Sequence, residues 1–306
     1  MNVIGFDTSN YTTSIAYYNG KNGINCSRLL PVKSGELGLR QSDAVFHHTK
    51  SLPELSDRLF STADCDCIDV VGVSTRPRAV EGSYMPCFMV GYSHAKLLAA
   101  ALEKPLVEVS HQQGHIAAAL WGAGRIDLME QPHLAWHLSG GTTELLMVQP
   151  DNKNVICSCI GGTSDISAGQ LIDRTGQMLG LDFPAGKAVD VLSREANTKD
   201  FFRVKCNEST FSFSGVENKV RQYSSSHDAA DTAYYALRSI AHAVYAATEA
   251  ALARYPGLPI VFSGGVASNS LLRELTAPLD PIYAPAEYST DNAMGVAILA
   301  HRILEA

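Results

Sequence analysis

The sequence has no excess of positive charge, since it carries 24 Lys and Arg residues against 31 Asp and Glu residues. Its net charge is -7 and its isoelectric point is near 5.8. A chain of this charge is not attracted as a whole to nucleic acid. Any contact with RNA must therefore use a local basic patch or a partner protein.

Long apolar runs and zinc-knuckle cysteine spacings are also missing. No stretch reaches the roughly 20 apolar residues that span a bilayer, and no signal peptide precedes the first predicted strand. The seven cysteines include two Cys-x-Cys pairs, at residues 65–67 and 157–159. These features predict a cytoplasmic protein with reduced thiols and no membrane contact. A redox or metal role for the Cys-x-Cys pairs stays open at this point.

What is present is an ordinary globular composition of 306 residues, 46% hydrophobic and 18% charged, which suffices for two lobes or one large domain. Apolar runs and turn residues predict an α/β protein. The predicted strands are residues 2–9, 12–18, 68–74, 105–109, 133–138, 144–148 and 258–262. The predicted helices are residues 50–62, 84–102, 166–179, 228–255, a helix opening near 270, and 293–304.

A histidine pair begins one predicted helix. His111 and His115 stand four residues apart, about one helical turn, so both imidazoles should project from the same face. The strand at 105–109 precedes them, and open α/β sheets bind ligands at the carboxyl ends of strands. Neutral imidazole is a common ligand of zinc, iron and copper, but a pair is only half a site. The alternative is a helix start that happens to carry two histidines.

Two glycine-rich turns each follow a predicted strand: Ser139-Gly140-Gly141-Thr142 and Gly264-Gly265. Glycine leaves room for a phosphate to approach backbone N–H groups, and the second turn precedes a helix, as phosphate cradles do. Tight turns without a ligand would explain both motifs equally well. Asn269 could bond a ribose or phosphate, or cap the helix. Asp291, before the last predicted helix, could likewise be a plain N-cap.

The repeated strand-and-turn pattern predicts two α/β lobes and resembles the superfamily of actin-like ATPases, sugar kinases and heat-shock chaperones. We expect residues 1–130 plus 292–306 to form the N-terminal lobe and residues 131–291 the C-terminal lobe. No low-complexity segment or flexible linker separates them, so we expect the lobes to be tightly hinged.

Within that superfamily the motifs resemble the tRNA threonylcarbamoyladenosine (t6A) synthase family, also called the glycoprotease or O-sialoglycoprotein endopeptidase family. The family pattern is an acidic-Thr-Ser turn, HxxGH, SGGHT, AAGEAFDK, YPGG, GGVAAN and TDN. The matches occur in this order over nearly the whole chain, at residues 7–9, 111–115, 139–141, 168–173, 183–186, 264–269 and 290–292.

The resemblance implies a metal-dependent transferase acting with accessory protein subunits. Iron or zinc would be bound by His111, His115 and Asp291, with coordination positions left open for substrate. The metal would polarise a carbamoyl group while adenine N6 of a tRNA attacks and AMP departs. Asp7 is the predicted catalytic carboxylate. The residues predicted to bind ATP, AMP or threonylcarbamoyl-adenylate are Ser139, Gly140, Gly141, Thr142, Asp173, Gly186, Gly264, Gly265 and Asn269.

Several positions depart from the family pattern. Asn10-Tyr11-Thr12 replace Cys-Asp-Glu, and Thr142, Gln170 and Ala185 replace a histidine, a glutamate and a glycine. The metal and nucleotide elements are thus better retained than the acid–base elements, which is typical of a divergent paralogue. Such a paralogue could hydrolyse the adenylate or ATP without tRNA, or serve as a non-catalytic partner of a true synthase. A zincin-type protease needs HExxH, and Gln112 at the glutamate position cannot act as its base.

Overall fold

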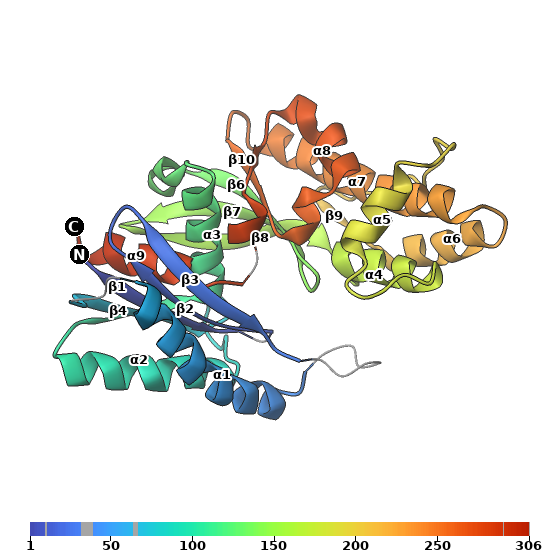
Figure 1. Cartoon of the computed structure of the whole chain (residues 1–306). Coiled ribbons are helices and arrows are strands. Elements are labelled where there is room, and N and C mark those ends of the chain that lie inside the picture. Colours follow the sequence, from blue (N-terminus) through green and yellow to red (C-terminus); the bar gives the residue numbers. More distant parts are fainter. Residues whose placement is uncertain (10, 32–38, 64–66, 290, 306) are drawn as a thin grey trace. The chain divides into compact units, whose positions relative to one another are not determined.

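The computed structural model describes residues 1–9, 11–31, 39–63, 67–289 and 291–305 (Figure 1). The chain forms two compact units. Unit 1 comprises Met1–Gln131, Gln149–Cys157 and Glu287–Ala306, and unit 2 comprises Pro132–Val148 and Ser158–Ala286. Asp291 therefore belongs to unit 1. The boundary expected from sequence had assigned it to the C-terminal lobe.

Unit 1 is built on a five-stranded sheet of order β3-β2-β1-β4-β5. The first three strands form an antiparallel meander, and β1, β4 and β5 run parallel. Their bounds are β1 Val3–Thr8, β2 Thr12–Tyr18, β3 Gly23–Leu29, β4 Val70–Arg76 and β5 Leu106–Ser110. The parallel strands β1, β4 and β5 bring three carboxyl ends to the same edge, which is where the histidine pair was expected.

Helices cover the two faces of this sheet. Helices α1 (Gln41–Thr62) and α2 (Phe88–Leu102) pack against the face that carries Ile4, Phe6 and Val73 (Figure 1). Helix α9 (Met294–Leu304) packs against Gly5 and Gly72 of β1 and β4, and α3 (His111–Gly122) packs on α9. Side chains alternate along a strand, so successive residues serve the two layers.

Unit 2 is built on a six-stranded sheet of order β11-β10-β6-β7-β8-β9. The strands are β6 His133–Leu138, β7 Thr143–Asp151, β8 Asn154–Thr163, β9 Thr210–Phe211, β10 Ile260–Ser263 and β11 Ile282–Tyr283. Helices α4 (Ala168–Met178), α5 (Gly186–Ser193), α6 (Ser214–Ser224), α7 (Ala229–Arg254) and α8 (Ser270–Thr276) complete a core that contains Trp136, Phe213 and Phe262. The order β8-β7-β6-β10-β11 repeats β3-β2-β1-β4-β5, so the same strand topology occurs twice.

Some predicted elements were wrong in extent. Helix α1 begins at Gln41 rather than at residue 50. The sequence did not indicate its first turns, because they bury little apolar surface and show no apolar period. Helix α2 begins at Phe88, after Pro86, and is no core helix: Met89 and Leu97 are 44% and 73% exposed. Strands β3 and β8 and helices α5 and α6 were not predicted.

None of the described cysteines forms a disulfide. Cys67, Cys157 and Cys159 form no disulfide, while Cys65 lies outside the described residues. Burial raises the pKa of Cys157 to about 12, so its thiol stays protonated and is a poor metal ligand or nucleophile. No described helix is both long and apolar enough to cross a membrane.

Candidate metal centre and nucleotide site

The histidine pair lies at the start of α3, as predicted. Strand β5 ends at Ser110, whose hydroxyl accepts a hydrogen bond from the backbone N–H of Gln113 at 3.3 Å. The Gln113 side chain accepts the N–H of Ser110 at 2.8 Å, which completes a capping box. Because this cap fixes where the helix begins, His111 is its first residue and His115 stands one turn further.

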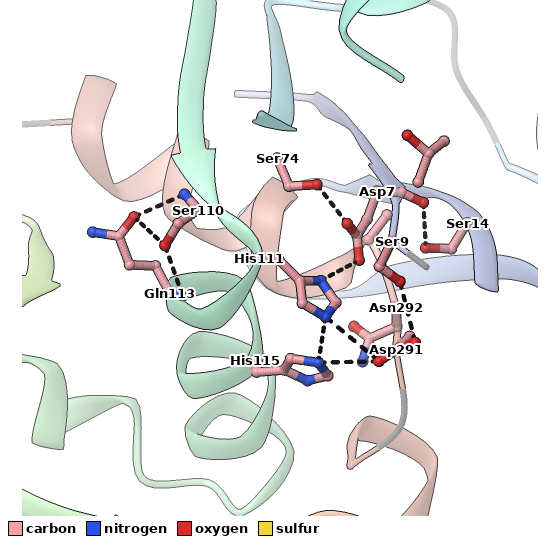
Figure 2. A network of polar contacts seen from close by, with 12 residues as sticks. Asp7, Ser9, Ser14, Ser74, Ser110, His111, Gln113, His115, Asp291 and Asn292 are labelled. Atoms are coloured by element: carbon pink, nitrogen blue, oxygen red, sulfur yellow. Dashed lines mark hydrogen bonds and ion pairs between the residues drawn. The ribbon is translucent and has the colours of Figure 1, made fainter. Parts of the chain in front are cut away.

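Asp291 joins the two histidines in one cluster of candidate metal ligands (Figure 2). The Nε2 atoms of His111 and His115 are 2.9 Å apart, and Asp291 Oδ1 lies 3.1 Å from His115 Nε2 and 3.5 Å from His111 Nε2. Ligand atoms bound about 2.1 Å from one ion lie roughly 3.0–3.4 Å from each other. The side chains therefore fit a transition-metal ion bound by two imidazoles and one carboxylate.

A second layer of polar groups holds these ligands in place. Asp7 Oδ2 accepts a hydrogen bond from His111 Nδ1 at 2.8 Å, and Asp7 Oδ1 accepts one from the Ser74 hydroxyl at 2.5 Å. The Ser9 hydroxyl donates to the other oxygen of Asp291 at 3.1 Å. A proton on Nδ1 leaves the lone pair of Nε2 pointing at the cluster, which is the arrangement typical of carboxylate–histidine–metal centres.

The carboxylates also set the protonation of the site. Burial by itself lowers the pKa of His111, but Asp7 and Asp291 outweigh it and raise this pKa to about 10. Burial raises the pKa of Asp291, but hydrogen bonds from His111 and His115 hold it well below its usual range. A proton must leave His111 before its Nε2 can bind a metal ion, so metal affinity should rise with pH.

The crossing of α3 and α9 brings Asp291 to the histidines. A Cβ atom built on Gly295 would lie 1.8 Å from the carbonyl oxygen of Gly114 and 3.0 Å from the Ala118 nitrogen. The backbones of the two helices are therefore in direct contact. Asp291 lies three residues before α9 and Gly114 lies between the two histidines, so this contact lies next to all three candidate ligands.

The first glycine-rich turn of unit 2 connects β6 and β7. Ser139 N–H donates to the Thr142 carbonyl at 2.8 Å, and the Ser139 hydroxyl accepts the N–H of Thr142 at 3.0 Å. The Ser167 hydroxyl, just before α4, donates to the Gly140 carbonyl at 2.6 Å. No atom lies within 4 Å of a Cβ built on Gly140 or Gly141, so the surface of the turn is open.

The second glycine-rich turn lies beside the first. Strands β6 and β10 are parallel neighbours, with Ser263 opposite His137, so Gly264 follows directly at the same edge. Gly264 has φ +94, and a Cβ there would lie 2.1 Å from the Leu138 carbonyl oxygen, so only glycine fits. Gly265, by contrast, has no atom within 4 Å of a built Cβ, and it is the one that could meet a ligand.

The remaining predicted nucleotide residues have structural partners of their own. Asp173 of α4 accepts the N–H of Ala185 at 2.9 Å, next to Gly186 at the start of α5. Asn269 caps α8 by accepting the N–H of Leu272 at 3.0 Å, and its amide donates to Asp190 at 2.8 Å. The structure brings the two turns together in one group and joins Asn269 to α5 through Asp190.

Two departures from the family pattern have structural explanations. Gln170 is the third residue of α4, and its side chain accepts the N–H of Ser167 at 3.0 Å in a second capping box. A glutamine serves that role as well as a glutamate, so no acid is needed there. Ala185 is 1% exposed and packs over Gly176. Thr142 has no such explanation, and Asn10 and Thr290 lie outside the described residues.

Several residues of the two groups could not be found from sequence. Ser74 and Gly295 are small residues without a motif of their own, and their roles arise from contacts with distant segments. Asp190 accepts from Asn269 and from both the N–H and the hydroxyl of Ser270, at 2.8–2.9 Å. Its position four residues after Gly186 on α5 was the available signal, because it places the carboxylate one turn from the predicted site.

Comparison with known proteins gives a consistent result. The family model for tRNA N6-adenosine threonylcarbamoyltransferase matches residues 36–298. A protein of that name from Prosthecochloris aestuarii is 32% identical, over 100% of this chain and 94% of its own.

Solved structures with very low sequence identity share the fold. HypF from T. kodakarensis has a TM-score of 0.63 at 13% identity, over 99% of this chain and 47% of its own. A ROK family glucokinase from Streptomyces griseus has a TM-score of 0.54 at 11% identity, over 99% of this chain and 100% of its own. The predicted actin-like ATPase fold, with its two mixed sheets flanked by helices, is thereby confirmed.

Proposed function

This chain belongs to the tRNA N6-adenosine threonylcarbamoyltransferase family, and on that premise we propose that it transfers a threonylcarbamoyl group from its adenylate to adenine N6 of a tRNA. In this reaction N6 bonds to the carbamoyl carbon, the bond from that carbon to the AMP phosphate oxygen breaks, and N6 loses a proton. AMP leaves with the bonding electron pair. The observation that supports the proposal most is the convergence of His111, His115 and Asp291.

His111, His115 and Asp291 would hold one divalent iron or zinc ion, which when bound would act as a Lewis acid on the carbamoyl oxygen. Asp7 is 1% exposed and both its oxygens are hydrogen-bonded, so we assign it to positioning His111 rather than to contact with substrate. Ser9 restrains Asp291 in the same way. The open backbone of the two glycine-rich turns would receive the adenylate phosphate or that of ATP.

A second candidate function is hydrolysis of the adenylate, or of ATP, without tRNA. It is favoured by Thr142 and Thr12, hydroxyl residues where the family pattern has an imidazole and a carboxylate. Neither hydroxyl is a base near neutral pH, and a positioned base commonly contributes about 10²–10⁴-fold to removing a proton. Water attack depends less on such a base when a bound ion acidifies the water.

We therefore expect the purified chain, without accessory subunits, to cleave threonylcarbamoyl-adenylate faster than it modifies tRNA. Single-turnover product analysis with labelled adenylate, with and without tRNA, measures both rates on one preparation. Transfer that is faster than cleavage would show that no additional base is needed. It would support the synthase function and argue against the hydrolase function. Absence of both products, with adenylate bound, would favour a non-catalytic partner subunit.

Gly265→Val is expected to weaken binding of AMP or ATP at least tenfold, about 1.4 kcal/mol by calorimetry. The valine has room within the protein, because no atom lies within 4 Å of its Cβ position, so it should obstruct a phosphate and not the fold. Gly215→Val is the matched control, since Gly215 of α6 is equally open. Unchanged affinity in a folded Gly265→Val protein would remove this turn from the nucleotide site.

Asp7→Asn is expected to lower zinc affinity about 10–100-fold, as loss of a hydrogen-bonding carboxylate behind a histidine ligand does. Asp7 also raises the pKa of His111, so zinc binding in the wild type should strengthen with pH up to the highest pH tested. In Asp7→Asn that strengthening should level off at a lower pH, because a weaker base loses its proton earlier. Zinc titrations between pH 6 and 8.5 measure both effects.

Asp69→Asn is the control for this experiment, because Asp69 accepts the N–H of Asn2 at the opposite end of β1. Its zinc affinity and pH profile should match those of the wild type. If Asp7→Asn behaves like Asp69→Asn, then Asp7 does not position a metal ligand.

A further inference from the structure

Unit 2 carries a local cluster of cations that the overall acidity of the chain conceals. The cluster consists of Lys199, Arg203, Lys205 and Arg238, which we call the α7 basic cluster. Three of its members lie in the segment 199–205, and Arg238 lies on α7, drawn in orange in Figure 1. Within residues 199–205 and 238–242 these four cations stand against a single carboxylate, Asp200.

Specific contacts hold this segment against α7. The N–H of Phe202 donates to the Ser239 hydroxyl at 2.8 Å, and the Val204 side chain is buried. The Phe201 ring lies 5.1 Å from the ring of His242, which is one turn after Arg238 on α7. The cluster is therefore part of the folded unit and not a set of independent surface side chains.

Aromatic rings orient two of the four cations. The Arg238 guanidinium carbon lies 6.0 Å from the centroid of the Phe201 ring, and the Lys199 ammonium lies 5.8 Å from that of Tyr234. A cation over a ring is restrained, yet its N–H groups stay available to an acceptor. In an ion pair, by contrast, a carboxylate of the protein already accepts from the N–H groups of the cation.

None of the four cations forms a salt bridge with a described residue, whereas Arg174 and Arg221 of the same unit pair with Glu217. Of the carboxylates nearby, Asp231 accepts the N–H groups of Asn197 and Thr198. Burial lowers the pKa of His242, and the charges of Arg203 and Arg238 lower it further. The four cations therefore have no ion-pair partner among the described residues.

We propose that the α7 basic cluster binds the phosphate backbone of the tRNA that accepts the threonylcarbamoyl group. This inference rests on the proposed function for the identity of the RNA. Cations without internal partners bind a polyanion by releasing its condensed counterions, which favours a phosphate backbone over a single small anion. A chain of net charge -7 needs such a local patch to hold RNA, and the cluster supplies four positive charges from α7 and the segment held against it.

The test is tRNA binding by Arg203→Gln/Arg238→Gln, measured with the full chain at several salt concentrations. Each lost phosphate contact makes the negative slope of log affinity against log salt shallower by about 0.7–0.9. The slope of the double variant should therefore be shallower by between about one and two. At low salt its affinity should fall about tenfold or more. Lys21→Gln/Lys104→Gln, which removes the same charge from unit 1, should bind tRNA like the wild type.

Four outcomes separate this inference from the proposed function. Equal tRNA affinity and salt slope in the cluster variant and the control would overturn it. Failure of the wild type to bind tRNA would also overturn it. Displacement of tRNA by polyglutamate at a lower concentration of charge than by a second RNA would overturn it too, and would indicate an acidic protein partner. If tRNA binding depends on the cluster but no threonylcarbamoyl reaches the RNA with accessory subunits present, the cluster stands and the proposed transferase function fails.

Discussion

The double variant His111→Ala/His115→Ala is expected to lose its metal ion on purification and to bind zinc at least about 100-fold more weakly than the wild type. Changing a group behind a ligand costs about 10–100-fold, and here two of the three candidate ligands themselves are removed. Asp291 would keep its partner Ser9 but would have no imidazole within reach. Threonylcarbamoyl transfer to tRNA should fall with metal content, which elemental analysis measures on the same samples.

The control is His47→Ala/His94→Ala, two histidines of the same unit outside the cluster. Near-ultraviolet circular dichroism should show that both double variants are folded. A stoichiometric metal ion retained by His111→Ala/His115→Ala would place the site elsewhere in the chain.

The second large effect is expected for Gly295→Ala, a change of one methyl group. Its Cβ would lie 1.8 Å from the Gly114 carbonyl oxygen, and since that oxygen belongs to a helix backbone, no flexible side chain can move aside. Helix α9 must shift away from α3, which moves Asp291 away from the two histidines. We expect unit 1 to lose about 1–3 kcal/mol of stability by overpacking, and zinc affinity to fall along with it.

Trp121 of α3 can report this loss, because its ring packs at 5.0 Å against Tyr288, close to the start of α9. In a Trp136→Phe background its fluorescence follows urea unfolding of unit 1 alone. Gly215→Ala in unit 2 is the control: its Cβ position has no neighbour within 4 Å and it lies outside the unit that Trp121 reports, so the Trp121 transition should match that of the wild type. If Gly295→Ala unfolds and binds zinc like the wild type, the helix crossing does not set the geometry of the centre.

The local parts of the candidate metal centre could be predicted from sequence. The spacing of His111 and His115 implies one helical turn, and Ser110 with Gln113 caps that turn through contacts within four residues. The repeat of strand, hairpin and glycine-rich turn likewise predicted two α/β halves of one fold. These inferences succeeded because helix period, strand alternation and turn conformation depend on neighbours in the chain.

Residues with two possible roles could not be resolved in that way. The amide of Asn269 can cap a helix or bond a ribose, and the cap is visible only once Leu272 and Asp190 are placed. From sequence, Gln170 was interpreted as the loss of a glutamate found in the family pattern. In the structure it is the partner of Ser167 in a capping box. The same functional groups serve both purposes, so the side chain alone cannot distinguish them.

The sequence by itself determined the family, the presence of two α/β lobes and the paired histidines at the start of α3. The family resemblance implied that Asp291 joins the histidines. Only the tertiary structure decided that Asp291, 176 residues beyond His115, lies 3.1 Å from it and that Asp7 lies behind His111. The physical reason is the contact between two glycines, Gly114 and Gly295, where the absence of a Cβ on one helix accommodates the backbone of the other. A contact of that kind depends on the packing of segments far apart in the chain, and the HxxGH motif around Gly114 does not show which residue packs against it.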